Sequence, residues 1–257
     1  MAQSLAKGLK ILFLFNRSRE VMTVKSIAAG IKVPLPTAYR FVKVLTQYGL
    51  LDKAEQPGHY QLGRTLLEFA GCIRQRLNIA TVAKPLVEKL AQISGETVQL
   101  TLRNGDHGTC ILVEESHSTL RVAPETGRVL PLHAGASVQV LLAFLSDDEQ
   151  RRMLDAPLKR FTPHTLTNPG KLLRRLRTIT RQGYAVSRGE TYPGAMGIAA
   201  PILDADGRVI ASLAVSGPAQ RMAQKRAAII ESTTALAREM SQLMGWNANS
   251  RSGQPRE

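Results

Sequence analysis

The sequence predicts an α+β fold in two domains, with a winged helix-turn-helix at the N-terminus and an antiparallel sheet flanked by helices in the larger second domain. Residues 1–63 hold three amphipathic helical segments and then a hairpin pattern, whereas residues 79–246 mix alternating strand patterns with helical ones. Residues 64–78 have the near-helical apolar spacing of a linker helix. A chain of 257 residues, 44% of them apolar, can build two buried cores.

Composition excludes several classes of protein. No apolar run approaches the roughly 18 to 20 residues that a membrane-spanning helix needs, and the N-terminus lacks a signal-peptide pattern. Cys72 and Cys110 are far apart and outside any CxxC spacing, so neither a disulfide framework nor a zinc knuckle is expected. We therefore expect a cytoplasmic chain that contacts no membrane, with a disordered polar tail at residues 247–257.

The formal net charge of +14 is unevenly distributed. Residues 1–78 hold 12 Lys or Arg against four Asp or Glu, while the longer remainder holds 22 against 16. This density of positive charge indicates a polyanionic partner for the N-terminal domain. Charge alone leaves open the alternative of a generally basic, solvated surface.

The first predicted helix, SLAKGLKILFLF, starts at a candidate N-cap, Ser4, and ends near Asn16. Its apolar residues recur at helical spacing on one side, at Leu5, Leu9, Leu12 and Phe13. A second apolar group lies on another face, at Ile11, Leu14 and Phe15. A helix that is apolar on more than one side packs against a further element, for which the candidates are a second chain and the linker helix.

A short helix, a turn and a longer helix follow. Thr23 is the candidate N-cap of the short helix and Gly30 its end, and the longer helix is expected from about Pro36 to Gln47. Its predicted inward residues are Ala38, Phe41, Val42 and Leu45. Its outward stripe is Pro36, Tyr39, Arg40, Lys43 and Gln47. This is the helix-turn-helix pattern, in which the second helix enters the major groove of DNA.

Two strand patterns, LLDKA and HYQLG, flank turn residues at 55–58 and predict the wing. Its tip, near residues 57–59, is expected to lie along the DNA backbone or minor groove. Seven residues are candidates for contact with phosphates, guanine edges or thymine methyl groups. They are Lys32, Pro36, Thr37, Tyr39, Arg40, Lys43 and His59. The alternative is that Arg40 and Lys43 only solvate an exposed helix face.

The second domain is predicted to begin with a helix at residues 80–94. Two antiparallel strands then turn at residues 104–106, and LRVAPE at 120–125 supplies a third strand. HAGASVQVLLAFL and LLRRLRTITRQG are predicted helices, and a hairpin turns at residues 204–207. That last turn resembles the opening of a calcium loop but lacks the remaining ligands, so a plain turn is expected.

These segments resemble, in order and spacing, the IclR family of bacterial transcription regulators. The likeness rests on SLAKGLKILFLF, PLPTAYRFVKVL, GLL and GHYQLG, and then on residues 127–145 and 183–218. Pro36 departs from the pattern, because the family usually carries Ser there; proline is tolerated in a first helical turn, so the helix start should be preserved. The resemblance implies that the second domain is a GAF/PAS-like effector-binding domain.

The resemblance also implies a ligand pocket. Backbone N–H groups at Gly135 and Ala136, where a helix starts, would receive a ligand carboxylate. The other implied pocket positions are Leu130, Ser187, Gly197, Ala214 and Ser216, with Leu132 as a second apolar wall. Relatives can place Asp, Cys and Ser where this chain has Ser187, Gly197 and Ala214. That exchange removes a charge and adds room, which favours a bulkier and partly apolar carboxylate, aromatic acids included, over a very small keto acid.

The expected function is a sequence-specific DNA-binding transcription regulator controlled by a small-molecule effector, acting as a homodimer or homotetramer on a palindromic double-stranded DNA operator. No catalytic residue, metal or cofactor is expected. The five histidines have no partner at metal-ligand spacing, and no GxSxG, Walker A or paired-carboxylate motif occurs. Two alternatives stay open, an enzyme fused to a basic domain and a GAF-like sensor that acts as a protein-interaction adaptor.

Overall fold

The computed structural model describes residues 2–16, 19–69 and 79–247. Contacts divide the chain into two compact units, one within residues 1–77 and one at residues 78–247. Within the described ranges, none of the helices is both long and apolar enough to cross a membrane.

The segment between the two units is described only in part. Residues 65–69 are helical, in line with the linker helix predicted at 64–78, and residues 70–78 lie outside the described ranges. The tail predicted at 247–257 lies outside them from residue 248 onward.

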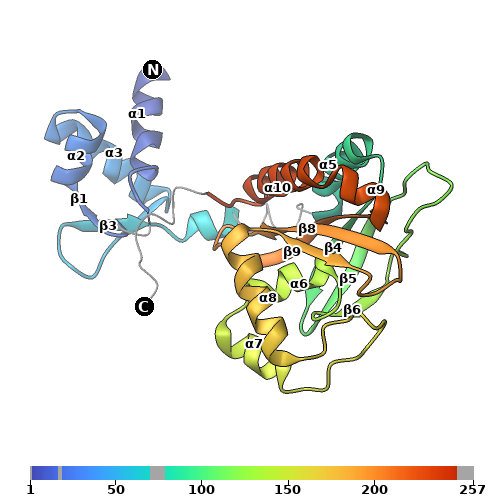
Figure 1. Cartoon of the computed structure of the whole chain (residues 1–257). Coiled ribbons are helices and arrows are strands. Elements are labelled where there is room, and N and C mark those ends of the chain that lie inside the picture. The colour runs from blue at the N-terminus through green and yellow to red at the C-terminus, as the bar shows by residue number, and fades with distance from the viewer. Residues whose placement is uncertain (1, 17–18, 70–78, 248–257) are drawn as a thin grey trace. The chain divides into compact units, whose positions relative to one another are not determined.

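The N-terminal unit consists of helices packed on a small antiparallel sheet, which is the predicted winged helix-turn-helix (Figure 1). Its strands lie in the order β1-β3-β2, so a short strand that the sequence did not predict pairs with the wing. One buried apolar cluster joins the helices to the sheet. The elements are α1 (Ala2–Leu12), β1 (Met22–Thr23), α2 (Val24–Ile31), α3 (Leu35–Gln47), β2 (Leu51–Lys53) and β3 (His59–Leu62).

Helix α1 packs its less regular apolar side inward. The helix begins at Ala2, so the prediction of Ser4 as its N-cap is wrong, and it ends before Asn16. Ile11, in its last turn, and Phe15, just beyond it, are the residues that are buried. Three of the four residues of the predicted apolar stripe are exposed, with fractions of 67, 43 and 85% at Leu5, Leu9 and Phe13, whereas Leu12 is half-buried against the core. Within the described part of this unit, α1 therefore keeps an exposed apolar face.

The ends of α2 are set by one side-chain cap and one unusual backbone angle. Thr23 caps the start as predicted, with its Oγ1 accepting a first-turn backbone N–H at 3.2 Å. The helix ends at Ile31 and not at Gly30, because Lys32 takes the left-handed conformation with φ 54°. Gly30 matters for packing instead, since a Cβ there would lie 2.8 Å from the Leu14 side chain.

Helix α3 starts at Leu35, one residue before the predicted start. Pro34 precedes it in an extended conformation, with φ −58° and ψ 145°, and Pro36 lies in the first turn, where a missing N–H breaks no helical bond. Three of the four predicted inward residues are buried, namely Ala38, Val42 and Leu45. The two prolines therefore fix where the helix begins and which of its sides faces outward.

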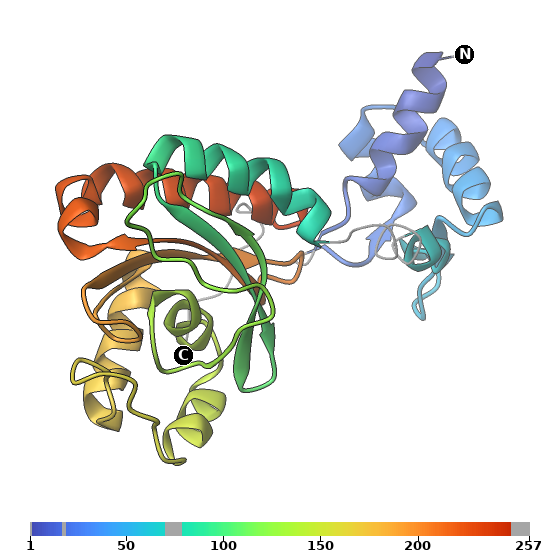
Figure 2. The ribbon, with the colours of Figure 1, turned by 90° about the vertical axis from the view of Figure 1, so that its right-hand side faces the viewer.

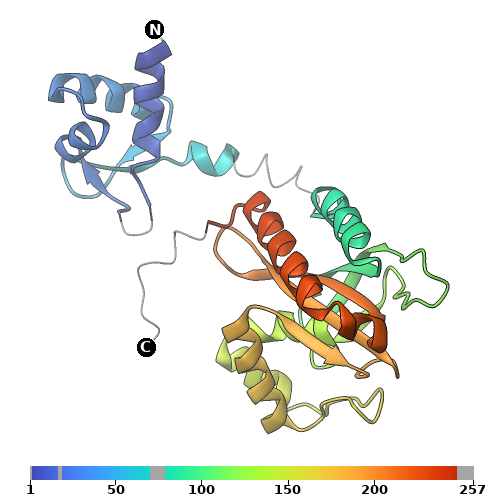
Figure 3. The ribbon, with the colours of Figure 1, turned by 45° about the horizontal axis from the view of Figure 1, so that its top comes forward.

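The second unit is a six-stranded antiparallel sheet with helices on both faces, which confirms the predicted α+β class (Figure 2). Helices α5 and α10 lie side by side on one face, and α6 and α8 cover the other (Figure 3). The strand order is β6-β5-β4-β9-β8-β7, with one apolar core on each face. The strands are β4 (Thr97–Asn104), β5 (His107–Glu114), β6 (Val129–Pro131), β7 (Ala185–Arg188), β8 (Ala195–Leu203) and β9 (Val209–Pro218). The helices are α5 (Ile79–Ser94), α6 (Ala136–Ala143), α7 (Asp147–Leu154), α8 (Pro169–Gln182), α9 (Ala219–Gln224) and α10 (Arg226–Leu243).

One predicted strand of this unit is wrong and one predicted hairpin is confirmed. Residues 120–125 form no strand, because the position beside β5 is taken by β6. Strands β8 and β9 form the predicted hairpin, and the Asp204 carboxylate in its turn accepts the backbone N–H groups of Asp206 and Arg208 at 2.9 Å each. A carboxylate that binds its own backbone stabilises a turn, as expected for this segment.

Candidate functional site

The outward side of α3 presents exposed polar and basic side chains. Pro36, Tyr39, Arg40 and Lys43 are exposed, and Thr37 is half-buried. Tyr39 is 55% exposed although it is a large aromatic residue. The side chains of Arg40 and Lys43 form no hydrogen bond or ion pair with another described residue. Both cations are therefore available to an external anion.

The two remaining predicted DNA contacts lie on either side of α3 in the sequence. Lys32 is exposed in the turn before the helix. His59 starts β3 half-buried, and its Nδ1 lies 3.2 Å from the carbonyl oxygen of Pro57, so its ring braces the wing turn. Gly58, at the tip, has φ 76° and open space where a Cβ would stand. The wing tip therefore carries no side chain at Gly58 itself.

The second unit contains a cavity of about 50 Å³ between the sheet and α6. The pocket positions predicted from the sequence all line it, namely Leu130, Gly135, Ala136, Ser187, Gly197, Ala214 and Ser216. Gly197 makes room at the α6 end, since a Cβ there would lie 3.1 Å from Ser187 Oγ. Leu132, which was predicted as a wall, is instead fully buried in the apolar core beneath the sheet.

The backbone N–H groups at the start of α6 already have acceptors from within the chain. Gly135 N donates to Glu190 Oε2 at 3.2 Å, and Ala136 N donates to Ser187 Oγ at 3.0 Å. The Gln139 side chain also donates to Glu190 Oε2, at 2.6 Å. Glu190 is 4% exposed, and burial raises the pKa of its carboxyl. This internal carboxylate lies where the sequence predicted that the carboxylate of a ligand would bind.

The cavity is also lined by residues that the sequence did not suggest. Arg128 lines the cavity, with its guanidinium carbon 4.4 Å from the centre of the Tyr192 ring. Cys110 lines it nearby, and burial raises the pKa of its thiol to about 11, so the thiol is neutral at physiological pH. Arg128 follows Gly127 directly inside a motif that the resemblance covers, yet nothing local in the sequence distinguishes it from a surface arginine.

No metal centre is found in the parts of the chain that the structure describes. Within those ranges, three or more His, Cys, Asp or Glu side chains nowhere gather closely enough to hold a metal ion. The residues that line the cavity carry hydroxyl groups, the guanidinium of Arg128 and the carboxyl group of Glu190.

Comparisons with known proteins identify both units. The model of the IclR helix-turn-helix domain matches residues 4–55, and that of the bacterial transcriptional regulator IclR C-terminal domain matches residues 73–242. The HTH-type transcriptional repressor AllR of Salmonella typhimurium is 33% identical over 226 residues, which cover 88% of this chain and 83% of the relative.

Solved structures agree with these matches. An IclR transcriptional regulator from Silicibacter sp. TM1040 superposes with a TM-score of 0.84 at 26% identity, over 95% of this chain and 96% of the other. An IclR homologue from Microbacterium hydrocarbonoxydans, solved in complex with 4-hydroxybenzoate, has a TM-score of 0.61 at 29% identity, over 94% and 98% of the chains. With both domains matched in order, this chain belongs to the IclR family of bacterial transcriptional regulators, which bind DNA through a helix-turn-helix.

Proposed function

We propose that this chain is a sequence-specific transcription regulator whose affinity for its operator is controlled by a small carboxylate bound in the cavity of the second unit. The outward side of α3 carries the DNA-binding part of this proposal. Its two cations, Arg40 and Lys43, are exposed and unpaired among the described residues. Such groups bind phosphates and guanine edges, whereas a protein-binding adaptor would favour an acidic or apolar face. The name of the relative AllR supports repression as the direction of control.

A gel shift tests the DNA-binding part, with DNA taken from upstream of the neighbouring genes and salt held constant. Arg40→Ala and Lys43→Ala should each weaken specific binding by about tenfold. Arg177→Ala removes an exposed arginine from α8 in the other unit and should leave the affinity unchanged. Wild-type affinity in both α3 variants would show that α3 is not the recognition helix.

The effector part is supported by the cavity, which all seven predicted residues line. Its volume of about 50 Å³ holds about four water molecules, at roughly 10–15 Å³ for each. Short keto or hydroxy acids are the smaller class of candidate effector, and benzoate-sized acids are the larger class. The relative that was solved with 4-hydroxybenzoate supports the larger class.

Calorimetry with glyoxylate, pyruvate, benzoate and 4-hydroxybenzoate separates the two classes of effector. We expect that one of these carboxylates binds and also changes the operator affinity in the gel shift. An effector can change that affinity only if it binds the DNA-binding state and the other state of the protein with different affinities. Binding confined to glyoxylate and pyruvate would reject the aromatic class.

The proposed assembly is a homodimer, alone or paired into a tetramer, because two-fold symmetry matches a palindromic operator. The exposed stripe of α1 at Leu5, Leu9 and Phe13 offers an apolar surface for the partner chain. Leu9→Glu should lower the apparent mass in sedimentation, and Glu68→Gln, at an exposed site on the same unit, should not. An unchanged mass in Leu9→Glu would exclude α1 from the interface.

A further inference from the structure

The α6 end of the cavity is poorly suited to a second carboxylate. Glu190 already accepts the N–H of Gly135 and the amide of Gln139, and Ala136 N–H donates to Ser187. Glu190 is 4% exposed, so water screens its charge little. An incoming carboxylate would therefore have to displace one internal acceptor and lie beside another carboxyl group.

The wall formed by Arg128 has the opposite character. Its backbone is held, because its N–H donates to Glu125 O at 3.1 Å and its carbonyl accepts from Cys110 N at 2.9 Å. The guanidinium is half-buried, and it forms no hydrogen bond or ion pair with any protein acceptor among the residues described. Burial lowers the pKa of Arg128, and the weaker effects of Cys110 and Glu125 oppose this. A partly desolvated cation without an acceptor is stabilised by an anion that enters the cavity.

Tyr192 orients this cation. Its ring lies against the guanidinium at 4.4 Å, a distance at which the ring face attracts the positive charge. A guanidinium that lies on an aromatic ring keeps its donors at its edge, where a carboxylate can accept two of them side by side.

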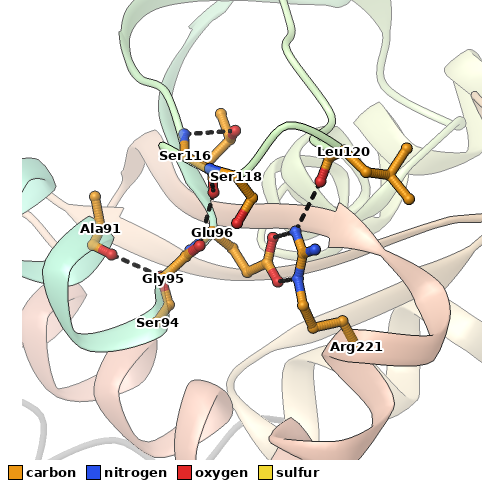
Figure 4. A network of polar contacts seen from close by, with 9 residues as sticks. Ala91, Ser94, Gly95, Glu96, Ser116, Ser118, Leu120 and Arg221 are labelled. Atoms are coloured by element: carbon orange, nitrogen blue, oxygen red, sulfur yellow. Dashed lines mark hydrogen bonds and ion pairs between the residues drawn. The ribbon is translucent and has the colours of Figure 1, made fainter.

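The segment that carries Arg128 is anchored at its other end. Residues 115–128 join β5 to β6 without regular structure. Arg221 forms two hydrogen bonds to the buried Glu96 carboxylate and a third to the carbonyl oxygen of Leu120 (Figure 4). Ser116 donates to Gly95 O at 2.7 Å, which ties the start of the segment to the end of α5 (Figure 4). The first part of the segment is therefore anchored although it belongs to no strand or helix.

We infer that Arg128 binds the carboxylate of the effector, in place of the backbone N–H groups at the start of α6. The rest of the ligand then extends over the floor of the sheet. Thr101 lines that floor, and its buried hydroxyl has no hydrogen-bond partner among the residues described. This inference rests on the proposed control by a small carboxylate, and it names the residue that distinguishes an acid from its neutral analogue.

Calorimetry on the full chain tests this assignment, with pyruvate and benzoate as probes and pyruvamide and benzamide as their neutral counterparts. Wild-type protein should bind an acid more tightly than its amide. Arg128→Gln should weaken binding of that acid about 10- to 100-fold, the usual effect of a lost charge-assisted hydrogen bond. Arg128→Lys should be intermediate, because lysine keeps the charge without the paired donors. Arg177→Gln should bind as wild type does, and melting temperatures show whether each variant is folded.

Three results would overturn the assignment. They are binding by Arg128→Gln within about twofold of wild type, equal affinity of wild type for acid and amide, and no binding of either acid at millimolar concentration. The gel shift separates this inference from the proposed function. If the acid changes the operator affinity of Arg128→Gln as much as it changes that of wild type, only the inference about Arg128 fails. If the acid binds through Arg128 but leaves the operator affinity unchanged, only the proposed control fails.

Discussion

The outward side of α3 and the start of α6 are both suited to anions, one through side-chain charge and the other through backbone N–H groups. On α3, Arg40 and Lys43 remain exposed and unpaired among the described residues. At α6, the N–H groups of Gly135 and Ala136 donate to acceptors from the same unit. Burial explains the difference, because water satisfies an exposed cation, whereas a buried N–H needs an internal acceptor. The exposed cations of α3 therefore stay open to an external anion, whereas the buried N–H groups at the start of α6 do not.

The largest expected effect comes from breaking a charge pair whose carboxylate is buried. Glu96 is 2% exposed, and its carboxylate is held by Arg221, whose Nη2 lies 2.7 Å from Oε2. Arg221→Met leaves this carboxylate buried without its cation, so we expect the free energy of unfolding to fall by about 3 kcal/mol. Chemical denaturation measures the change. Because Arg221 also binds Leu120 O, affinity for the effector should weaken as well.

An exposed pair in the same segment is the matched control. Arg121 Nε lies 2.8 Å from Glu115 Oε2, and the two side chains are 41% and 52% exposed. Arg121→Met should cost less than about 1 kcal/mol, because water replaces the lost partner. Equal losses in the two arginine variants would show that burial does not decide the contribution of these pairs.

A smaller effect is expected on DNA affinity when the exposed cations of α3 are replaced. If Lys43 binds a phosphate, Lys43→Ala should reduce the slope of log affinity against log salt by about one, with similar losses on specific and unrelated DNA. If Arg40 binds a base edge, Arg40→Ala should lower affinity mainly for the specific operator. Gel shifts at several salt concentrations measure both. Identical behaviour of the two variants would mean that Lys43 and Arg40 do not have separate roles in binding phosphate and base edges.

The N-terminal unit shows where sequence patterns suffice. The caps, prolines and apolar spacing of α2 and α3 act within a few residues, so the predicted helix-turn-helix agrees with the structure. Helix α1 differs, because it is apolar on two sides and its period cannot say which side packs inward. Ile11 is buried whereas Phe13 is 85% exposed, because the neighbouring helices pack against the side of α1 that carries Ile11.

The cavity shows where sequence patterns do not suffice. The seven pocket positions came from resemblance to a family, and all of them line the cavity. Glu190 was missed because the N–H that it accepts is 55 residues away at Gly135. Arg128 was missed because its exposure, its contact with Tyr192 and its lack of an acceptor among the described residues arise only after folding. The strand predicted at 120–125 failed for a similar reason, since the sheet edge is occupied by β6.

The smallest expected effect concerns the carboxyl group that occupies the start of α6. Burial raises the pKa of Glu190, and the hydrogen bond from Gly135, the charge of Arg175 and the hydrogen bond from Gln139 offset this only in part. The unfolded chain then releases this proton at a lower pH than the native chain does. The contribution of Glu190 to the free energy of unfolding therefore falls as pH rises above the ordinary glutamate pKa. It stops falling once the carboxyl group has also ionised in the native chain.

Glu190→Gln removes that ionisation and keeps an oxygen that can accept the Gly135 N–H. The variant should match wild type at acid pH and exceed its free energy of unfolding at neutral pH, by about 1 kcal/mol or less. Denaturation across the acid-to-neutral range checks this, with Glu239→Gln, at an exposed site on α10, expected to follow the wild-type profile. If the free energies of unfolding of wild type and Glu190→Gln changed in parallel with pH, ionisation of the buried carboxyl group would not destabilise the native chain. The start of α6 would then be as tolerant of negative charge as the outward side of α3 is expected to be.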